Sequence, residues 1–230
     1  MSAGTNTTPL TAISGDRETR ERLLREAELL FADRGFNGVT VREICSAAHA
    51  NVAAVNYHFG DKLGLYREVM RIAIAGMREV TDSAREAGQG LPAADRLRAY
   101  VTLFLHRLLT PGRETIHHLI QRETADPTPL LDDLVDRGLR PRLDYLGSIV
   151  AEMIGCERSD SRVMLCVMSI ISQTVMYARH NAIADRLGYS MNPTAAEIDA
   201  TARHIADFSI GGIDAVGAVG RNAEPTHAST

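Results

Sequence analysis

The sequence contains no tryptophan, and aromatic residues make up only 5% of its 230 residues. A hydrophobic core must therefore be built mainly from Leu, Ile, Val, Met and Ala, a composition that suits packed helices better than sheets. No segment alternates polar and apolar residues for long enough to predict a strand. These absences predict an all-α protein.

Cysteine is also scarce, since Cys45, Cys156 and Cys166 are the only three and share no Cys-x-x-Cys spacing. This pattern predicts neither a disulfide framework nor a structural zinc site, so we interpret all three as small buried side chains in a reducing compartment. The chain also lacks an apolar run long enough to span a bilayer and a basic-then-apolar signal at its start. We therefore expect a cytoplasmic protein without a membrane partner.

The signatures of common enzyme sites are missing as well. There is no P-loop, nucleophile elbow, HExxH motif or glycine-rich dinucleotide fingerprint. Glu123 and Asp126 lie near Arg122 in the sequence, and we interpret them as part of a solvated helix face. His117 and His118 are adjacent, so they point to different sides of a helix and make a poor metal pair. We expect no catalysis, no cofactor and no metal ion.

The chain also lacks an excess of positive charge, since its net charge is -4. Its first 70 residues hold eight Lys and Arg against nine Asp and Glu. Nucleic-acid binding would therefore depend on local positive charge, helped by the N-termini of helices.

What is present is a succession of helical patterns. Residues 1–15 are polar and predict a disordered arm, whereas from Asp16 apolar residues recur at helical spacing to Arg34, and Gly35 stands where a helix usually ends. Later helices are predicted at about 51–57, 61–87, 93–109, 114–125, 129–154 with a kink at Pro141, 160–186 and 194–216. We divide the chain into the arm (1–15), a three-helix DNA-binding domain (16–62), a helical regulatory and dimerisation domain (63–220) and a flexible tail (221–230).

Residues 40–58 have the layout of a helix-turn-helix, with two short helices and a tight turn between them. Thr40 and Glu43 form the pattern of a capping box at the start of the first of these helices. We predict that Val52 and Val55 anchor the second helix. Small or amide side chains remain to meet base edges in the major groove, namely Asn51, Ala53, Ala54 and Asn56.

Two longer runs carry a specific resemblance. The first reads FADRGFNGVTVREI and then NVAAVNYHFGDKLGLY, and over residues 18–70 it resembles the TetR family of repressors. The second, IHHLIQRETADPTPLLDDLV, is similar to the CecR-like subgroup. The resemblance implies a homodimeric repressor that binds a palindromic operator in double-stranded DNA and is released when a small-molecule inducer binds its C-terminal domain.

The same resemblance places phosphate contacts on Thr40, Tyr57, His58 and Lys62 and leaves Val52 on the DNA-binding helix. Arg42 is a further candidate, from the outward face of its own helix. The alternatives are that Tyr57 and His58 only end a helix, and that Asn51 is only an N-cap.

One position departs from the pattern of the family. The turn between the two short helices reads Ala48-His49-Ala50-Asn51, where family members usually have glycine followed by an apolar residue. Glycine tolerates a left-handed backbone, and histidine adopts it at some cost. We predict that His49 takes the left-handed conformation or that the turn shifts slightly.

The resemblance also implies that the last two long helices form the dimer interface. We assign to it the apolar stripe Val163, Val167, Ile170, Ile171, Val175, Ile198, Ile205 and Phe208; the alternative is that these stripes are core within one chain. Candidates for the ligand pocket are His106, His117, His118, Gln121, Met153, Met164, Met168, Gln173, Met176 and Tyr177, although helical Met is more often plain core. The alternative function is a dimeric helical ligand-binding protein without specific DNA binding.

Overall fold

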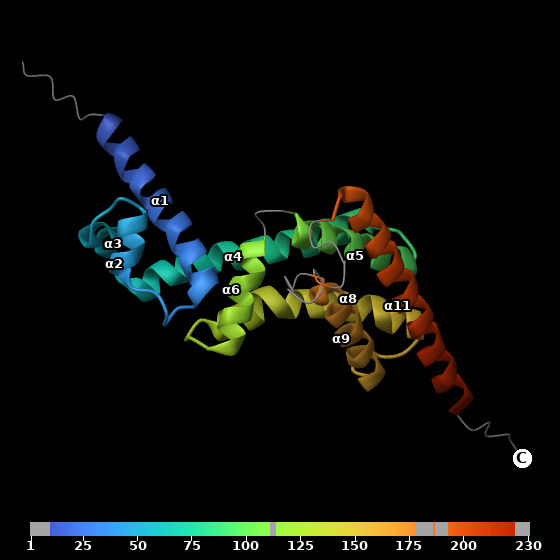
Figure 1. Cartoon of the computed structure of the whole chain (residues 1–230). Coiled ribbons are helices and arrows are strands. Elements are labelled where there is room, and N and C mark those ends of the chain that lie inside the picture. The colour runs from blue at the N-terminus through green and yellow to red at the C-terminus, as the bar shows by residue number, and fades with distance from the viewer. Residues whose placement is uncertain (1–9, 111–113, 178–185, 187–192, 224–230) are drawn as a thin grey trace, which may run out of the picture. The chain divides into compact units, whose positions relative to one another are not determined.

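The computed structural model describes residues 10–110, 114–177, 186 and 193–223 (Figure 1). Within these ranges the chain forms helices and no strand, which confirms the all-α prediction. None of the described helices is both long and apolar enough to cross a membrane.

The helices follow the predicted order closely. They are α1 (Leu10–Arg34), α2 (Val41–Ala47), α3 (Val52–Phe59), α4 (Lys62–Ala87), α5 (Ala93–Leu109), α6 (Glu114–Ala125), α7 (Leu131–Leu134), the π-helical segment η1 (Val135–Leu139), α8 (Arg140–Ile154), α9 (Ser161–Met176) and α11 (Ala195–Ala223).

The ends of the described chain differ from the prediction. Helix α1 begins at Leu10, so the predicted arm is wrong for residues 10–15, and residues 1–9 lie outside the described residues. Helix α11 likewise runs to Ala223, past the start of the predicted tail. Most of the predicted tail and residues 178–185 of the predicted 160–186 helix fall outside the described residues.

The break expected near Pro141 takes an unusual form. Helix α7 passes into the π-helical η1, and α8 begins at Arg140 with Pro141 in its first turn. Proline lacks a backbone N–H, and its ring clashes with the preceding turn of a regular helix. A wider π turn ahead of it resolves that conflict, and the first turn of α8 needs no N–H at that position.

The chain divides into two compact units, each described by itself below. The head unit comprises the residues up to Ala73 together with His118–Leu131, and the body unit comprises Ile74–His117 and the chain from Asp132 onward. The divisions therefore fall inside α4 and α6. The sequence placed a boundary at residue 62, whereas the compact head unit includes the start of α4 and a second, distant segment of chain.

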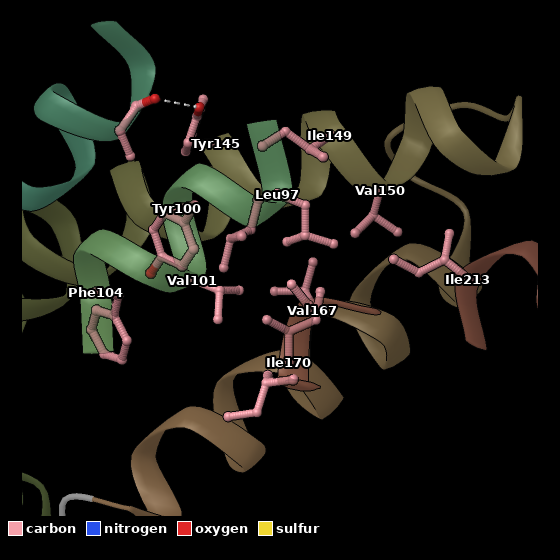
Figure 2. Packing of buried hydrophobic residues seen from close by; sticks show 14 of the residues in the cluster. Leu97, Tyr100, Val101, Phe104, Tyr145, Ile149, Val150, Val167, Ile170 and Ile213 are labelled. Carbon is pink, nitrogen blue, oxygen red and sulfur yellow. Dashed lines mark hydrogen bonds between the residues drawn. The ribbon is translucent and has the colours of Figure 1, made fainter. Parts of the chain in front are cut away.

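The body unit is built around one hydrophobic core to which α5, α8, α9 and α11 contribute (Figure 2). Leu97 and Val101 of α5 meet Ile149 of α8 and Val167 of α9, and all four side chains are fully buried. The hydroxyl of Tyr145 donates to the backbone carbonyl of Ala84 at 3.0 Å, which ties α8 to the last turns of α4. The core thus holds these long helices in fixed register.

Ile149 tests this packing. Ile149→Ala should lower the free energy of unfolding by about 2–5 kcal/mol, because it removes buried methylenes and leaves a cavity between helices. Leu29→Ala is the control, since Leu29 on α1 is 56% exposed and its truncation should cost less than about 1 kcal/mol. Urea denaturation followed by circular dichroism measures both. Equal decreases in the free energy of unfolding for the two variants would contradict the described core.

Candidate DNA-binding interface

The start of α2 is fixed by the capping box that the sequence predicted. The backbone N–H of Glu43 donates to the Thr40 hydroxyl at 3.3 Å, and the backbone N–H of Thr40 donates to the Glu43 carboxylate at 2.7 Å. This arrangement satisfies two backbone donors at the helix N-terminus. The end of α1 is also as predicted, since Gly35 has a φ of 73° and donates to Phe31 at 2.8 Å.

The turn between α2 and α3 contains the predicted strained residue. His49 has a φ of 49° and is the one described residue other than glycine with a positive φ. The backbone N–H of Ala50 donates to Cys45 at 2.9 Å, and Arg22 of α1 donates to the carbonyl of Ala48 at 3.1 Å. These bonds hold the turn, and through it the start of α3, against α1.

Helix α3 is anchored through one of the two valines that were predicted to hold it. Val55 is fully buried, whereas Val52 is 42% exposed, so the anchoring role of Val52 was wrong. Val52 is the first residue of α3, and its neighbours Asn51 and Ala53 are exposed as well. The first turn of α3 therefore stands clear of the packing surface.

Asn51 is an N-cap, because its side-chain oxygen accepts the backbone N–H of Ala54 at 2.8 Å. The cap uses only this oxygen and leaves the two N–H donors of the amide for other partners. Asn56 and Tyr57 are exposed, Tyr57 at 77%, and Ala54 is half-buried. The predicted base-facing residues therefore lie at the accessible surface of α3, with small side chains between two amides.

His58 lies differently from Tyr57. Its side chain is only 7% exposed, and its Nε2 is 3.4 Å from the carboxylate of Asp16. The Tyr57 and His58 rings meet edge to face at 5.0 Å. The imidazole is thus packed into the head unit, and the predicted phosphate contact by its side chain finds no support in this geometry.

Lys62, the single lysine of the chain, opens α4. Its ammonium lies 4.2 Å from the centre of the Phe36 ring, a cation–π contact, and burial lowers its pKa while the nearby Glu43 carboxylate opposes that shift. Phe36 belongs to an aromatic group with Phe31 and Tyr66. Lys62 is therefore held in place at the beginning of α4.

Negative charge lies close to this cation. The Glu43 carboxylate accepts from the Thr40 hydroxyl and from Arg34, the latter at 2.8 Å, and these bonds lower its pKa to about 2. Glu43 is thus ionised at neutral pH beside the N-terminus of α2, while Arg42 is exposed. The interface is locally balanced in charge, as the count over the first 70 residues indicated.

The head unit also contains a buried carboxylate, that of Glu123. Glu123 is only 1% exposed and accepts the Tyr66 hydroxyl at 2.7 Å and both the backbone N–H and the hydroxyl of Thr128 at 2.9 Å. Burial and this carboxylate raise the pKa of Tyr66. The sequence interpretation of Glu123 as part of a solvated face was wrong, because one acidic residue in a polar segment gives no sign of a distant tyrosine partner.

Residues 118–131 make two further contacts with the rest of the head unit. The exposed Asp126 accepts from the side chain of Asn37 at 2.8 Å, and Arg122 donates to the carbonyl of Asp33. The second half of α6 and the loop after it thereby belong to the same compact unit as α1, α2 and α3.

The predicted pocket residues do not come together in the body unit. Met164, Met168, Met176 and Tyr177 are 41–60% exposed on α9 and its end, so they do not line an interior cavity within one chain. Met153 is half-buried against the core, and His117, His118 and Gln121 are half-buried on α6. His106 lines a hollow of about 360 Å³ between α4 and α5, and its Nε2 lies 2.6 Å from the carboxylate of Asp199.

The predicted dimer stripe also needs correction. Val163, Val167, Ile170, Ile198 and Ile205 are at most 5% exposed because they face the core of their own chain. Ile171 and Val175 are half-buried, and Phe208 is 65% exposed. Helix α9 is apolar on two faces, and helical periodicity alone does not show which of them faces inward.

The second apolar face of α9 borders a groove shared with α11. The groove has a volume of about 230 Å³ and is lined by Leu165, Cys166, Ser169, Ile170, Gln173, Phe208, Ser209, Gly212, Ile213 and Val216. Leu165 is 68% exposed beside it. Of the predicted pocket residues, Gln173 lies here. No group of three or more His, Cys, Asp or Glu residues in the described part of the chain is arranged to hold a metal ion.

Two protein families match this chain. Residues 23–69, which include α2 and α3, match the bacterial regulatory proteins of the tetR family. Residues 93–213 match the C-terminal domain of the HTH-type transcriptional dual regulator CecR. The two matches cover the helix-turn-helix and most of the body unit.

Individual proteins similar to this chain are also named as transcriptional regulators. The chain is 28% identical over 181 residues to the HTH-type transcriptional dual regulator CecR of Shigella flexneri, covering 74% of this chain and 79% of that protein. It is 26% identical over 141 residues to the HTH-type transcriptional repressor BepR of Brucella suis biovar 1, covering 61% and 67%. The crystal structure of AibR in complex with isovaleryl coenzyme A and operator DNA shares the fold, with a TM-score of 0.56, 19% identity and coverage of 84% of this chain and 97% of that one.

Because His49 has a left-handed backbone, glycine should stabilise position 49 more than alanine does, which is the reverse of their order inside a helix. His49→Gly should exceed His49→Ala in free energy of unfolding by about 1 kcal/mol, because only glycine adopts this conformation without a steric cost. At the exposed, helical Ser46 the order should reverse, and Ser46→Ala should exceed Ser46→Gly by about 1 kcal/mol. Thermal or urea denaturation of the four variants measures both differences, and the same sign at both positions would show that position 49 is unstrained.

Proposed function

Since this chain belongs to the TetR family of transcriptional regulators, in its CecR-like branch, we propose that it is a repressor that binds a palindromic operator as a homodimer and leaves it when a small molecule binds the body unit. The chain is a DNA-binding regulator and not an enzyme, in line with its matched families and relatives. Repression, the dimer, the operator symmetry and the inducer are the proposed parts.

The observation that carries the proposal is the surface of α3. Buried Val55 fixes the helix to the head unit, and the exposed first turn leaves Asn51, Val52 and Ala53 free of packing. Such a short helix with small and amide side chains fits into the major groove, which is about 12 Å wide. The free N–H groups of Asn51 and the side chain of Asn56 are the candidates for base contacts.

Phosphate contacts are proposed on either side of α3. Tyr57 offers an exposed hydroxyl, Lys62 a cation and Arg42 an exposed guanidinium. The hydroxyl of Thr40, at the N-terminus of α2, has to exchange its bond to Glu43 for one to a phosphate. Helix N-termini attract anions because their first N–H groups are unpaired. Glu43 weakens this attraction locally, which favours binding that depends on fit to the groove as well as on charge.

A second copy of the chain is the proposed partner of the α9–α11 face. This face presents the exposed side chains of Leu165 and Phe208, and apolar side chains of this size grouped on a surface often mark an interface. Pairing two copies about a two-fold axis gives the assembly two recognition helices related by that axis. Helices about 34–36 Å apart then read half-sites in successive turns of the major groove.

The release mechanism requires two states of the dimer. An inducer lowers operator affinity only by binding the DNA-incompetent state more tightly. AibR, a structural neighbour, was crystallised with both an acyl coenzyme A and operator DNA. We propose that this chain couples a ligand and an operator in the same general way, with a ligand of its own.

The charge balance of the head unit favours one alternative, a dimeric ligand-binding protein without specific DNA binding. Salt separates the two functions. Operator affinity that falls steeply with rising salt reports the release of counterions from phosphates, and specific preference for one duplex over another reports base contacts. An absence of preference among genomic fragments at low salt would support the alternative.

Substitutions separate phosphate from base contacts. Lys62→Ala should weaken binding to operator and unrelated duplex by the same factor and reduce the salt slope by about one. Asn51→Ser keeps an oxygen for the cap and should change the preference among operator variants by about 1–3 kcal/mol. Arg137→Ala, an exposed charge in the body unit, is the control and should change neither. Fluorescence anisotropy at several salt concentrations measures all three.

Lys62 also permits a direct footprint. Because it is the single lysine, an amine-acetylating reagent labels only this side chain and the N-terminus. Operator DNA should slow acetylation of Lys62, as measured by mass spectrometry of peptides, and leave the N-terminal amine as an internal reference. Equal acetylation with and without bound DNA would contradict the assigned contact.

Phe208 tests the dimer. Phe208→Glu should convert the dimer to a monomer, because it places a charge in an apolar interface, and operator affinity should fall with it. Leu29→Glu, also at an exposed apolar position, is the control and should leave the dimer intact. Size-exclusion chromatography with light scattering measures the mass. A dimeric Phe208→Glu variant would place the interface elsewhere.

A further inference from the structure

Arg142, on the inward side of α8, is a cation that pairs with no carboxylate among the residues that the structure describes. It precedes Tyr145 by three residues and Leu146 by four, and since both of these are buried, Arg142 shares their face of the helix. The residue itself is half-buried. It therefore points toward the packed side of the body unit, where a charged residue is unusual.

The Arg142 side chain lies over an aromatic ring. The central carbon of its guanidinium lies 5.0 Å from the centre of the Phe104 ring. Phe104 in turn stacks on Tyr100 at 5.8 Å with an angle of 8° between the rings, and Tyr100 is almost fully buried. Figure 2 shows both rings projecting from α5 at one end of the core cluster. The cation is thus placed at the edge of an apolar, aromatic surface.

No anion accompanies this cation among the described residues. The Nε of Arg142 is buried without a hydrogen-bond partner, as are the Nε atoms of Arg96 and Arg158. Arg96 and Arg158, however, each pair with a carboxylate through another nitrogen, with Glu152 and Asp144 respectively. Arg142 has the ring of Phe104 and no carboxylate.

This arrangement leaves the charge incompletely stabilised. The Nε–H group is the part that has left water without an acceptor, which is unfavourable because a guanidinium stays protonated and each buried N–H needs a partner. The face of an aromatic ring recovers only part of that loss. An anion that enters beside Phe104 would supply both the missing charge and the missing acceptors.

We propose that Arg142 binds the carboxylate of the effector of this regulator, and that the apolar part of the effector lies beside Phe104. The proposal rests on the ligand response given under Proposed function. A planar guanidinium holds a carboxylate by two parallel hydrogen bonds. We choose a monoanion because, in the described part of the chain, no second cation lies over the Phe104 ring.

Calorimetry on the purified full chain without DNA tests the site. The carboxylate probes are benzoate and octanoate, their neutral counterparts are benzamide and octanamide, and inorganic phosphate is the competing anion. At least one carboxylate should bind at millimolar concentration, with its amide binding at least about tenfold more weakly. Arg142→Met, which keeps an unbranched chain on Phe104, should weaken carboxylate binding at least about tenfold.

The control is Arg140→Met on the same helix, because Arg140 is exposed and paired with Asp136 at 2.8 Å. It should bind the carboxylate like the wild type. The melting temperature of unliganded Arg142→Met should be equal to or above that of the wild type, since an uncompensated charge has been removed. A lower melting temperature would identify Arg142 as a structural residue and overturn the proposal.

Three binding results would also overturn it: no carboxylate bound by the wild type, unchanged carboxylate binding in Arg142→Met, or phosphate bound more tightly than both carboxylates. Because DNA is absent, each of these results leaves the DNA-binding function intact. In a separate anisotropy assay Arg142→Met should keep operator affinity and lose release by the carboxylate. If the wild-type protein bound no operator in that assay, the result would instead contradict the proposed function.

Discussion

The head unit depends on a carboxylate that has no access to water. Glu123 is stabilised by the Tyr66 hydroxyl and by two groups of Thr128, and a buried carboxylate that lost these donors would be strongly destabilising. This constraint holds residues 118–131 against the start of α4, although more than fifty residues of chain separate them. Both α4 and α6 continue from the head unit into the body unit.

Within that frame, the recognition helix is positioned by short-range geometry. The capping box starts α2, the left-handed His49 turns the chain, and buried Val55 fixes α3. Each of these features leaves the opposite side of α3 uncommitted to packing. The surface proposed to meet DNA is therefore what remains after the head unit has satisfied its own core and its backbone donors, and this explains why it carries little net charge.

The body unit uses the same helices for two purposes. One face of α9 closes the core with α5, α8 and α11, and the other borders the groove at Phe208. A helix with two apolar faces can be buried on one side in its own chain and on the other in a partner. Arg142 departs from this apolar packing, since its charge meets the Phe104 ring and, in the described part of the chain, no acid.

The sequence by itself determined the helical class, the bounds of α3 to α6 to within about two residues, the capping box, the left-handed turn and the family. These depend on neighbours within a few positions or on a motif of fixed spacing. Only the tertiary structure decided which face of α9 is inside, that Val52 is exposed and His58 packed, and that Glu123 is buried beside Tyr66. Periodicity shows that a face is apolar without showing what covers it. The partner of a buried polar group comes from a distant segment, and its position follows only from how the helices pack.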